Sequence, residues 1–185
     1  MSALPVDVIL VRHAMPVLVP EVSAEQWRLG PPGRAAARAL GRTLEPGVVV
    51  SSDEPKAAET AAEIAAVHGA GVGLDHRFGE ALRPYVWTDG ASYRDRARAY
   101  LRGGAVEGWE PHAFVAARFA AALADHAPRA LATGVPLIVV THGLAMTLWA
   151  GSIGALTDRV AWWEPLGFPD AVRVAGPEAA RLRAD

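Results

Sequence analysis

The sequence predicts an α/β fold, a three-layer α/β/α sandwich around a mostly parallel central sheet. Short apolar runs alternate along the chain with longer segments whose apolar residues recur at helical spacing. In addition, 51% of the residues are hydrophobic and 21% are charged, a balance typical of a packed core. The 185 residues fit a single domain, 1–185.

The individual elements follow from these patterns in chain order. We expect strands where apolar runs are short and bounded by polar or turn residues, at 6–11, 47–50, 72–74, 136–140 and 171–174. We expect helices where apolar residues share one helical face, at 33–44, 55–65, 112–126 and 144–150. Pro55 suits the first turn of its helix, because that position needs no backbone N–H.

The segment from 78 to 111 lacks either pattern and is predicted to be irregular. Several prolines and glycines interrupt it, and it holds Tyr85, Trp87, Tyr93 and other polar aromatic residues. Long segments of this kind are often lids or the rims of binding sites. The sequence therefore predicts a lid-like insertion at about 81–111.

Composition excludes several classes of function. The net charge of -2 argues against a nucleic-acid-binding protein, which needs a basic surface. There is no cysteine, so a disulfide scaffold, a thiolate metal site and a cysteine nucleophile are impossible. The first residues lack the basic start of a signal peptide, and His142 and two glycines break the longest apolar stretch, so no membrane association is expected. We expect a cytoplasmic protein, either a monomer or a homodimer.

Ionisable side chains follow three of the predicted strands at their carboxyl ends. Arg12 and His13 follow the first strand, Lys56 the second and His142 the fourth. Ligands of parallel α/β sheets bind at this edge, so the four side chains are expected to converge. An arginine there can bind two phosphate oxygens, and a neutral imidazole can act as a nucleophile. Taken singly, each has a plainer interpretation as a packed strand-end residue or a solvated charge.

Three further residues are candidates for the same site. Gly143 opens the helix after His142, where it lets the backbone approach a ligand, and free N–H groups at a helix start favour an anion. Thr141 is expected to cap that helix. Near a phosphate the pKa of Glu80 would rise, which suits a general acid, although an isolated glutamate is most often a surface charge.

Four motifs occur in an order that resembles a known family. They are LVRHA at 10–14, SSDEPKAAETA at 51–61, GEALRP at 79–84 and VVTHG at 139–143. Together they resemble the signatures of the histidine phosphatase superfamily (phosphoglycerate mutase-like, branch 1). The likeness extends from about residue 6 to the last predicted strand. It implies a phosphoglycerate mutase-like fold.

The resemblance also implies a role for each site residue. His13 would be the phosphorylated nucleophile, and its other ring nitrogen should donate to a backbone carbonyl. Arg12 and His142 would hold the phosphoryl oxygens, and Lys56 occupies the place of the family's second pocket arginine. Glu80 would protonate the departing alcohol and then activate water. No metal and no cofactor is implied, because the positive donors stabilise the transferring group.

This chain departs from the family pattern at several positions. Ala14 replaces the usual glycine, Met15, Pro16 and Val17 replace polar residues, and Lys56 keeps the charge of an arginine without its two-pronged geometry. These departures, and the absence of the mutases' longer insertions, favour a phosphatase acting on a small phosphorylated metabolite. A phosphoglycerate mutase-type phosphotransferase and a weakened or inactive member that only binds phosphate ligands are the alternatives.

The lid-like segment and the remaining histidines complete the sequence-based expectations. Arg83 and Tyr85, with Trp87, Tyr93 and Arg94, would hold the leaving group or pack locally. The other histidines lack the strand-end context and the ligand spacing of a metal site; they are His68, His76, His112 and His126.

Overall fold

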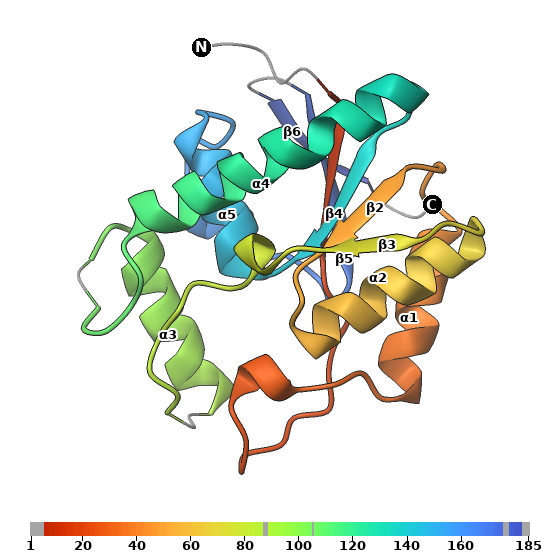
Figure 1. Cartoon of the computed structure of the whole chain (residues 1–185). Helices are drawn as coiled ribbons and strands as arrows, with labels where there is room; N and C mark the ends of the chain where they lie inside the picture. The colour runs from red at the N-terminus through yellow and green to blue at the C-terminus, as the bar shows by residue number, and fades with distance from the viewer. Residues whose placement is uncertain (1–5, 87–88, 105, 176–177, 183–185) are drawn as a thin grey trace.

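The computed structural model describes residues 6–86, 89–104, 106–175 and 178–182, and these form a six-stranded sheet with helices on both faces. The strand order is β3-β2-β4-β1-β5-β6. Strands β1 to β4 pair in parallel, whereas β5 runs antiparallel to both β1 and β6 (Figure 1). The strands are β1 (Val8–Arg12), β2 (Val48–Ser51), β3 (Val72–Leu74), β4 (Leu137–Thr141), β5 (Asp170–Ala175) and β6 (Glu178–Leu182).

Central strands β1 and β4 are buried on both faces, which explains their continuous apolar sequences. Successive side chains of a strand point to opposite faces. Val8 and Leu10 accordingly join the larger core cluster, whereas Ile9 and Val11 join the smaller cluster on the other face. The sheet therefore separates two hydrophobic cores.

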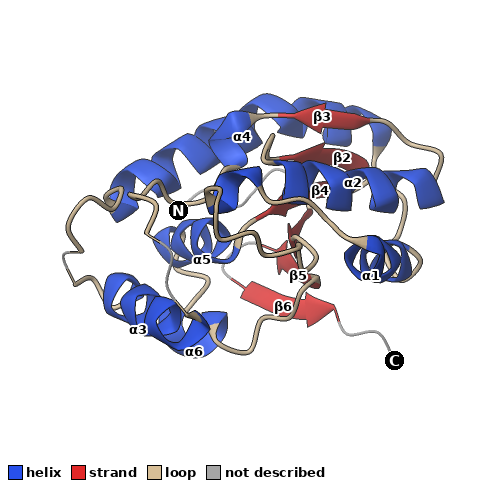
Figure 2. Cartoon of the chain, turned by 90° about the horizontal axis from the view of Figure 1, so that it is seen from below, coloured by secondary structure: helices blue, strands red, loops and turns tan. Residues whose placement is uncertain are grey.

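Helices close both cores, which makes the molecule three-layered (Figure 2). Helix α2 supplies buried alanines and Ile64 to the smaller core and packs against α1. The larger core is covered by α4 and α5, with α3 and α6 beside them. The helices are α1 (Pro31–Gly41), α2 (Pro55–Val67), α3 (Gly90–Leu101), α4 (His112–Thr133), α5 (Gly143–Ser152) and α6 (Arg159–Trp163), with single 3₁₀ turns at Ala24–Gln26 and His76–Phe78.

The three-layer prediction and the five predicted strands are confirmed, with shifts of one or two residues at their ends. Two short elements, α6 and β6, were not predicted. Helix α6 has five residues, too few for a helical periodicity, and is marked mainly by Asp158, whose side chain accepts hydrogen bonds from Val160 and Ala161. Strand β6 lies at the edge of the sheet, where a strand needs no apolar run.

The prediction that 78–111 is irregular is wrong over Gly90–Leu101, which forms α3. Its start is capped by Asp89, whose carboxylate accepts hydrogen bonds from Ala91 and Ser92. Its helical face is hard to recognise because only Ala97, Tyr100 and Leu101 are buried. Helix α4 likewise runs past the predicted end at 126, through Pro128, to Thr133, because buried Ala127 and Ala130 continue its apolar face.

The parallel strands β1, β2 and β4 end at one edge of the sheet. Their last residues, Arg12, Ser51 and Thr141, lie within one residue of the same register. Helices α2 and α5 begin a few residues after β2 and β4. The chain after β1 forms the loop that closes this edge from below in Figure 1. None of the described helices combines the length and apolarity needed to span a membrane.

Candidate active site

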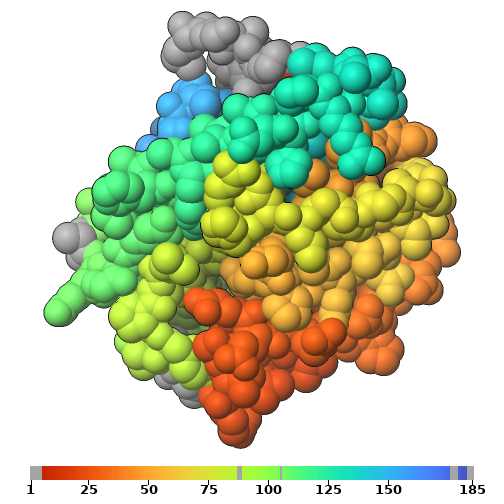
Figure 3. All heavy atoms as spheres, in the orientation of Figure 1, coloured from red at the N-terminus to blue at the C-terminus, as the bar shows by residue number. Residues whose placement is uncertain are grey.

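A cavity of about 610 Å³ opens at this edge of the sheet. It is lined by Arg12, His13, Lys56, Glu80 and His142, so residues from four distant stretches of chain meet there. Gly143, Arg83 and Tyr85 line the same cavity. In Figure 3 the surface is hollowed between the red-orange segment after β1 and the yellow-green segment that leads to α3. The expected convergence is therefore present in the structure.

His13 is held so that one ring nitrogen is available. Its backbone N–H donates to the Thr141 carbonyl at 3.0 Å, which continues the β1–β4 pairing by one residue. Its Nδ1 lies 2.8 Å from the Ala14 carbonyl, and a carbonyl only accepts, so Nδ1 carries the proton. Burial, reinforced by nearby His142 and Lys56, lowers the pKa of His13 well below its usual value. The neutral ring thus keeps a free lone pair on Nε2.

Thr60 fixes the loop that carries His13. Its hydroxyl accepts from the Ala14 N–H at 3.0 Å and donates to the Lys56 carbonyl at 2.7 Å. Ala14 and Thr60 are both fully buried, so the contact ties the loop that carries His13 to the first turns of α2. Thr60 was not among the predicted site residues, because its role depends on a contact between residues 46 positions apart.

The guanidinium of Arg12 is held by Leu166 and Phe168. Nη1 donates to the Leu166 carbonyl at 2.8 Å, and the guanidinium carbon lies 3.5 Å from the centre of the Phe168 ring. Burial lowers the pKa of Arg12 to about 10, so the side chain remains charged at neutral pH. Its Nε is buried without a partner among the described residues. Arg12 therefore retains a donor for a ligand.

Gly143 makes room for this arginine. A Cβ atom at this position would lie 3.2 Å from the Arg12 guanidinium and 2.9 Å from the Trp163 indole nitrogen. Real Cβ atoms almost never approach other atoms so closely. The glycine after His142 is therefore required by close packing around Arg12.

The His142 ring lies edge-on to the His13 ring, with ring centres 5.1 Å apart. Its Nε2 contacts the Ser52 hydroxyl at 3.0 Å and a carboxylate oxygen of Glu54 at 3.2 Å. The carboxylate requires the proton on Nε2, which leaves Nδ1 buried and unpartnered in the described structure. Burial and the charge of Lys56 lower the pKa of His142 well below its usual value. An anion bound at Nδ1 would favour protonation there.

The Lys56 side chain is buried, and its ammonium has two partners. Its ammonium donates to the Ala24 carbonyl at 2.7 Å and forms a very short contact with Glu54. Lys56 was among the predicted site residues, whereas Glu54 and Ser52 were not. The available signal was the run of polar residues between β2 and α2, where Glu54 stands two residues before Lys56.

Glu80 is bound to the start of α5. Its carboxylate accepts from the N–H groups of Ala145 at 2.8 Å, Leu144 at 3.2 Å and Ala81 at 3.0 Å. The expected cap, Thr141, was wrong, because its hydroxyl donates instead to the Phe78 carbonyl at 2.6 Å. The anion-attracting helix end beside His142 is thus taken by a carboxylate of this chain.

Residues of the predicted lid-like segment line part of the cavity. Tyr85 donates its hydroxyl to the Pro20 carbonyl at 2.5 Å, which joins the lid segment to the loop after β1. Arg83 donates to the Ala81 carbonyl at 2.8 Å and lies over the Tyr93 and Trp109 rings. Tyr93 and Arg94 also line the cavity, whereas Trp87 lies outside the described residues.

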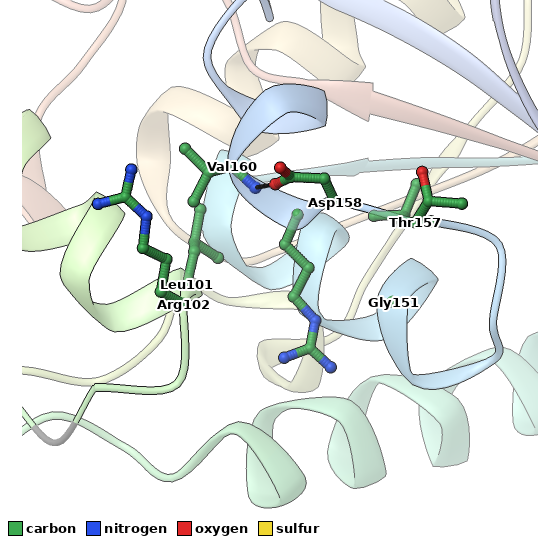
Figure 4. A pocket seen from close by; sticks show the side chains of 8 residues that line it. Leu101, Arg102, Gly151, Thr157, Asp158 and Val160 are labelled. Carbon is green, nitrogen blue, oxygen red and sulfur yellow. Dashed lines mark hydrogen bonds between the residues drawn. The ribbon is translucent and has the colours of Figure 1, made fainter.

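A second, smaller cavity of about 360 Å³ lies among α3, α5 and α6 (Figure 4). Its lining includes Arg102 and Asp158, and the Asp158 carboxylate is bonded to the Val160 N–H at 2.8 Å. None of the residues singled out from the sequence lines it. Within the described ranges, no three His, Asp or Glu side chains are grouped so as to hold a metal ion.

Comparison with protein families gives a match over most of the chain. The family model for the histidine phosphatase superfamily (branch 1) matches residues 8–167. That range includes all four motifs identified in the sequence. No curated protein sequence matches the chain.

Solved structures share the fold at low sequence identity. The phosphate complex of mycobacterial glucosyl-3-phosphoglycerate phosphatase is 22% identical over 97% of this chain and 95% of that chain, with a TM-score of 0.71. YhfR of Bacillus stearothermophilus is 20% identical over 95% and 94%, with a TM-score of 0.70. A phosphoglycerate mutase from Bacillus anthracis is 15% identical over 95% and 91%, with a TM-score of 0.68. The predicted phosphoglycerate mutase-like fold is confirmed.

Proposed function

The chain belongs to the histidine phosphatase superfamily, branch 1, and on this premise we propose that it is a phosphatase that hydrolyses monoesters of small phosphorylated metabolites through a phosphohistidine on His13. The observation that carries the proposal is the neutral imidazole of His13, whose Nε2 lone pair is free beside Arg12, Lys56 and His142. Phosphoryl transfer depends mainly on positioning and on positive donors around the phosphoryl oxygens.

In the first proposed step, Nε2 of His13 attacks phosphorus and the bond from phosphorus to the ester oxygen breaks. Arg12 Nε and protonated His142 Nδ1 donate to the phosphoryl oxygens, as both nitrogens lack partners within the described chain. Each donor of this kind contributes about 3 kcal/mol to transition-state stabilisation, by analogy with oxyanion-hole deletions. Glu80 gives a proton to the departing alkoxide.

In the second step, water attacks the phosphorus of phosphohistidine. Glu80 takes a proton from this water, the bond to Nε2 breaks, and inorganic phosphate leaves with His13 neutral again. The hydrogen bond from Nδ1 to the Ala14 carbonyl keeps the ring in one orientation through both steps. No metal and no cofactor takes part in the proposed sequence.

The cavity mouth supports an apolar or aromatic leaving group. Four of the nine exposed large apolar side chains in the described chain line this cavity, and they are Met15, Leu18, Tyr85 and Val86. Exposed apolar side chains gathered at a pocket commonly mark a binding surface. We expect kcat/KM for an aryl phosphate to exceed that for glycerol phosphate. Leu18→Ser should reduce this preference, whereas Leu131→Ser, a similarly exposed leucine on α4, should not.

The nucleophile is tested by trapping. Wild-type protein and His13→Ala are incubated with a chromogenic phosphate ester in the presence of EDTA. We expect turnover and an acid-labile, base-stable phosphoryl-protein in the wild type only. Equal turnover by both proteins would reject the nucleophile assignment.

Two alternatives have their own readouts. A mutase would exchange phosphoglycerate isomers without releasing phosphate, so both products are followed together. The Lys56 ammonium already has two partners in this chain, which favours the second alternative, a weakened family member that binds phosphate ligands. Binding without turnover on a broad panel of phosphate esters would support it.

A further inference from the structure

The phosphate cavity contains a carboxylate that the sequence motifs did not draw attention to. Glu54 forms a very short ion pair with Lys56, and the two side chains are only 12% and 7% exposed. An exposed ion pair is weakened by water and salt, whereas a buried pair is screened much less. The charge of Glu54 therefore acts directly on Lys56.

Several contacts fix Glu54 in this position. The oxygen that faces away from Lys56 accepts from the Glu80 N–H at 2.9 Å and lies 3.2 Å from His142 Nε2. The backbone N–H of Glu54 donates to the Ser52 hydroxyl at 3.2 Å. Glu54 is thus a built part of the site and is bonded to the backbone and side chains that surround the phosphate position.

As a result, four charged side chains that line the cavity balance one another. The cations Arg12 and Lys56 are matched by the carboxylates Glu54 and Glu80, and both imidazoles are neutral when the site is empty. A phosphate dianion that binds Lys56 must share the ammonium with Glu54 or lie beside a like charge. Without Glu54, the group of Arg12, Lys56 and Glu80 would carry one net positive charge.

We propose that Glu54 is a positioning residue. Its carboxylate is an internal counter-ion that holds the Lys56 ammonium, and it competes with phosphate for that ammonium. The competition weakens the binding of the phosphoryl group and of the phosphate product, and so favours product release. The inference rests on the proposed function only in that this cavity receives a phosphate group.

Glu54→Gln provides the test. The amide oxygen can still accept from Glu80 and His142, while the charge that holds Lys56 is removed. Asp53→Asn is the matched control, because Asp53 is the adjacent residue in the chain and its side chain is exposed. Dissociation constants for inorganic phosphate are measured by calorimetry for wild type, both variants, Lys56→Gln and the Glu54→Gln/Lys56→Gln double variant. Thermal unfolding checks that each protein is folded, and Glu54→Ala replaces Glu54→Gln if the latter is not.

We expect Glu54→Gln to bind phosphate at least tenfold more tightly, which corresponds to about 1.4 kcal/mol. Asp53→Asn should stay within twofold of wild type, and the gain should vanish in the Lys56→Gln background. Unchanged or weaker binding by Glu54→Gln overturns the inference, as does an equal gain without Lys56. If wild type and all variants neither bind phosphate nor turn over esters, the proposed function fails instead.

Discussion

Gly143→Ala tests whether the packing around Arg12 sustains activity. The added methyl group would lie 2.9 Å from the Trp163 indole nitrogen and 3.2 Å from two atoms of the Arg12 guanidinium. Ordinary contacts begin at about 3.5 Å, so one neighbour must move by roughly half an ångström. The shorter contact is with Trp163, but both neighbours are buried, so we expect the Arg12 guanidinium to be shifted along with the Trp163 indole. Loss of one aligned donor should reduce kcat/KM about a hundredfold, or about 3 kcal/mol.

The stability change separates this steric effect from a helix effect. Alanine is a better helix former than glycine by up to about 1 kcal/mol, whereas overpacking costs about 1–3 kcal/mol. We therefore expect the free energy of unfolding of Gly143→Ala, measured in urea, to be about 0–2 kcal/mol lower than that of wild type. Gly90→Ala, at the first residue of α3 with nothing within 4 Å of the added Cβ, should be neutral or stabilised. The reasoning is refuted if Gly143→Ala keeps its activity within twofold and matches Gly90→Ala in stability.

Three further predictions concern other groups. Thr60→Val leaves the buried Ala14 N–H unpaired, so we expect its free energy of unfolding in urea to be roughly 1–3 kcal/mol lower than that of wild type. Thr60→Ser keeps the hydroxyl and should match wild type. Hydrogen bonds from Arg77 lower the pKa of Asp75, so its stabilisation is complete above the unfolded pKa of about 3.9 and is lost as pH falls further. Unfolding free energies of Asp75→Asn should then fall less steeply than those of wild type below pH 4. Finally, the His13 imidazole should show no NMR titration near its ordinary pKa, and a midpoint at about 6.5 would contradict its burial.

The elements that the sequence predicted well are those whose own residues carry the signal. Strands β1 and β4 are buried on both faces, so their continuous apolar runs were visible in the sequence. Helix α3 was missed because few of its residues are buried. Helix α4 was predicted too short because Pro128 normally ends a helix, while packing against the core overrode that preference.

The candidate site divides in the same way. His13 and His142 were recognisable because each directly follows a buried strand, and parallel strands place their carboxyl ends together. Glu54 was not recognised, since an acidic residue at a helix start is ordinarily a favourable cap. Only its contacts with Lys56, Glu80 and His142 distinguish it.

The sequence by itself determined five of the six described strands, the helices α1, α2, α4 and α5, and the identity of the imidazoles and cations at one edge, because strand burial and residue order are local properties of the chain. The tertiary structure alone decided the charge balance of the cavity and the end of α5 that Glu80 occupies. Electrostatic energy depends on the distance between groups and on their burial, and for residues far apart in the chain neither is written in the order of the amino acids.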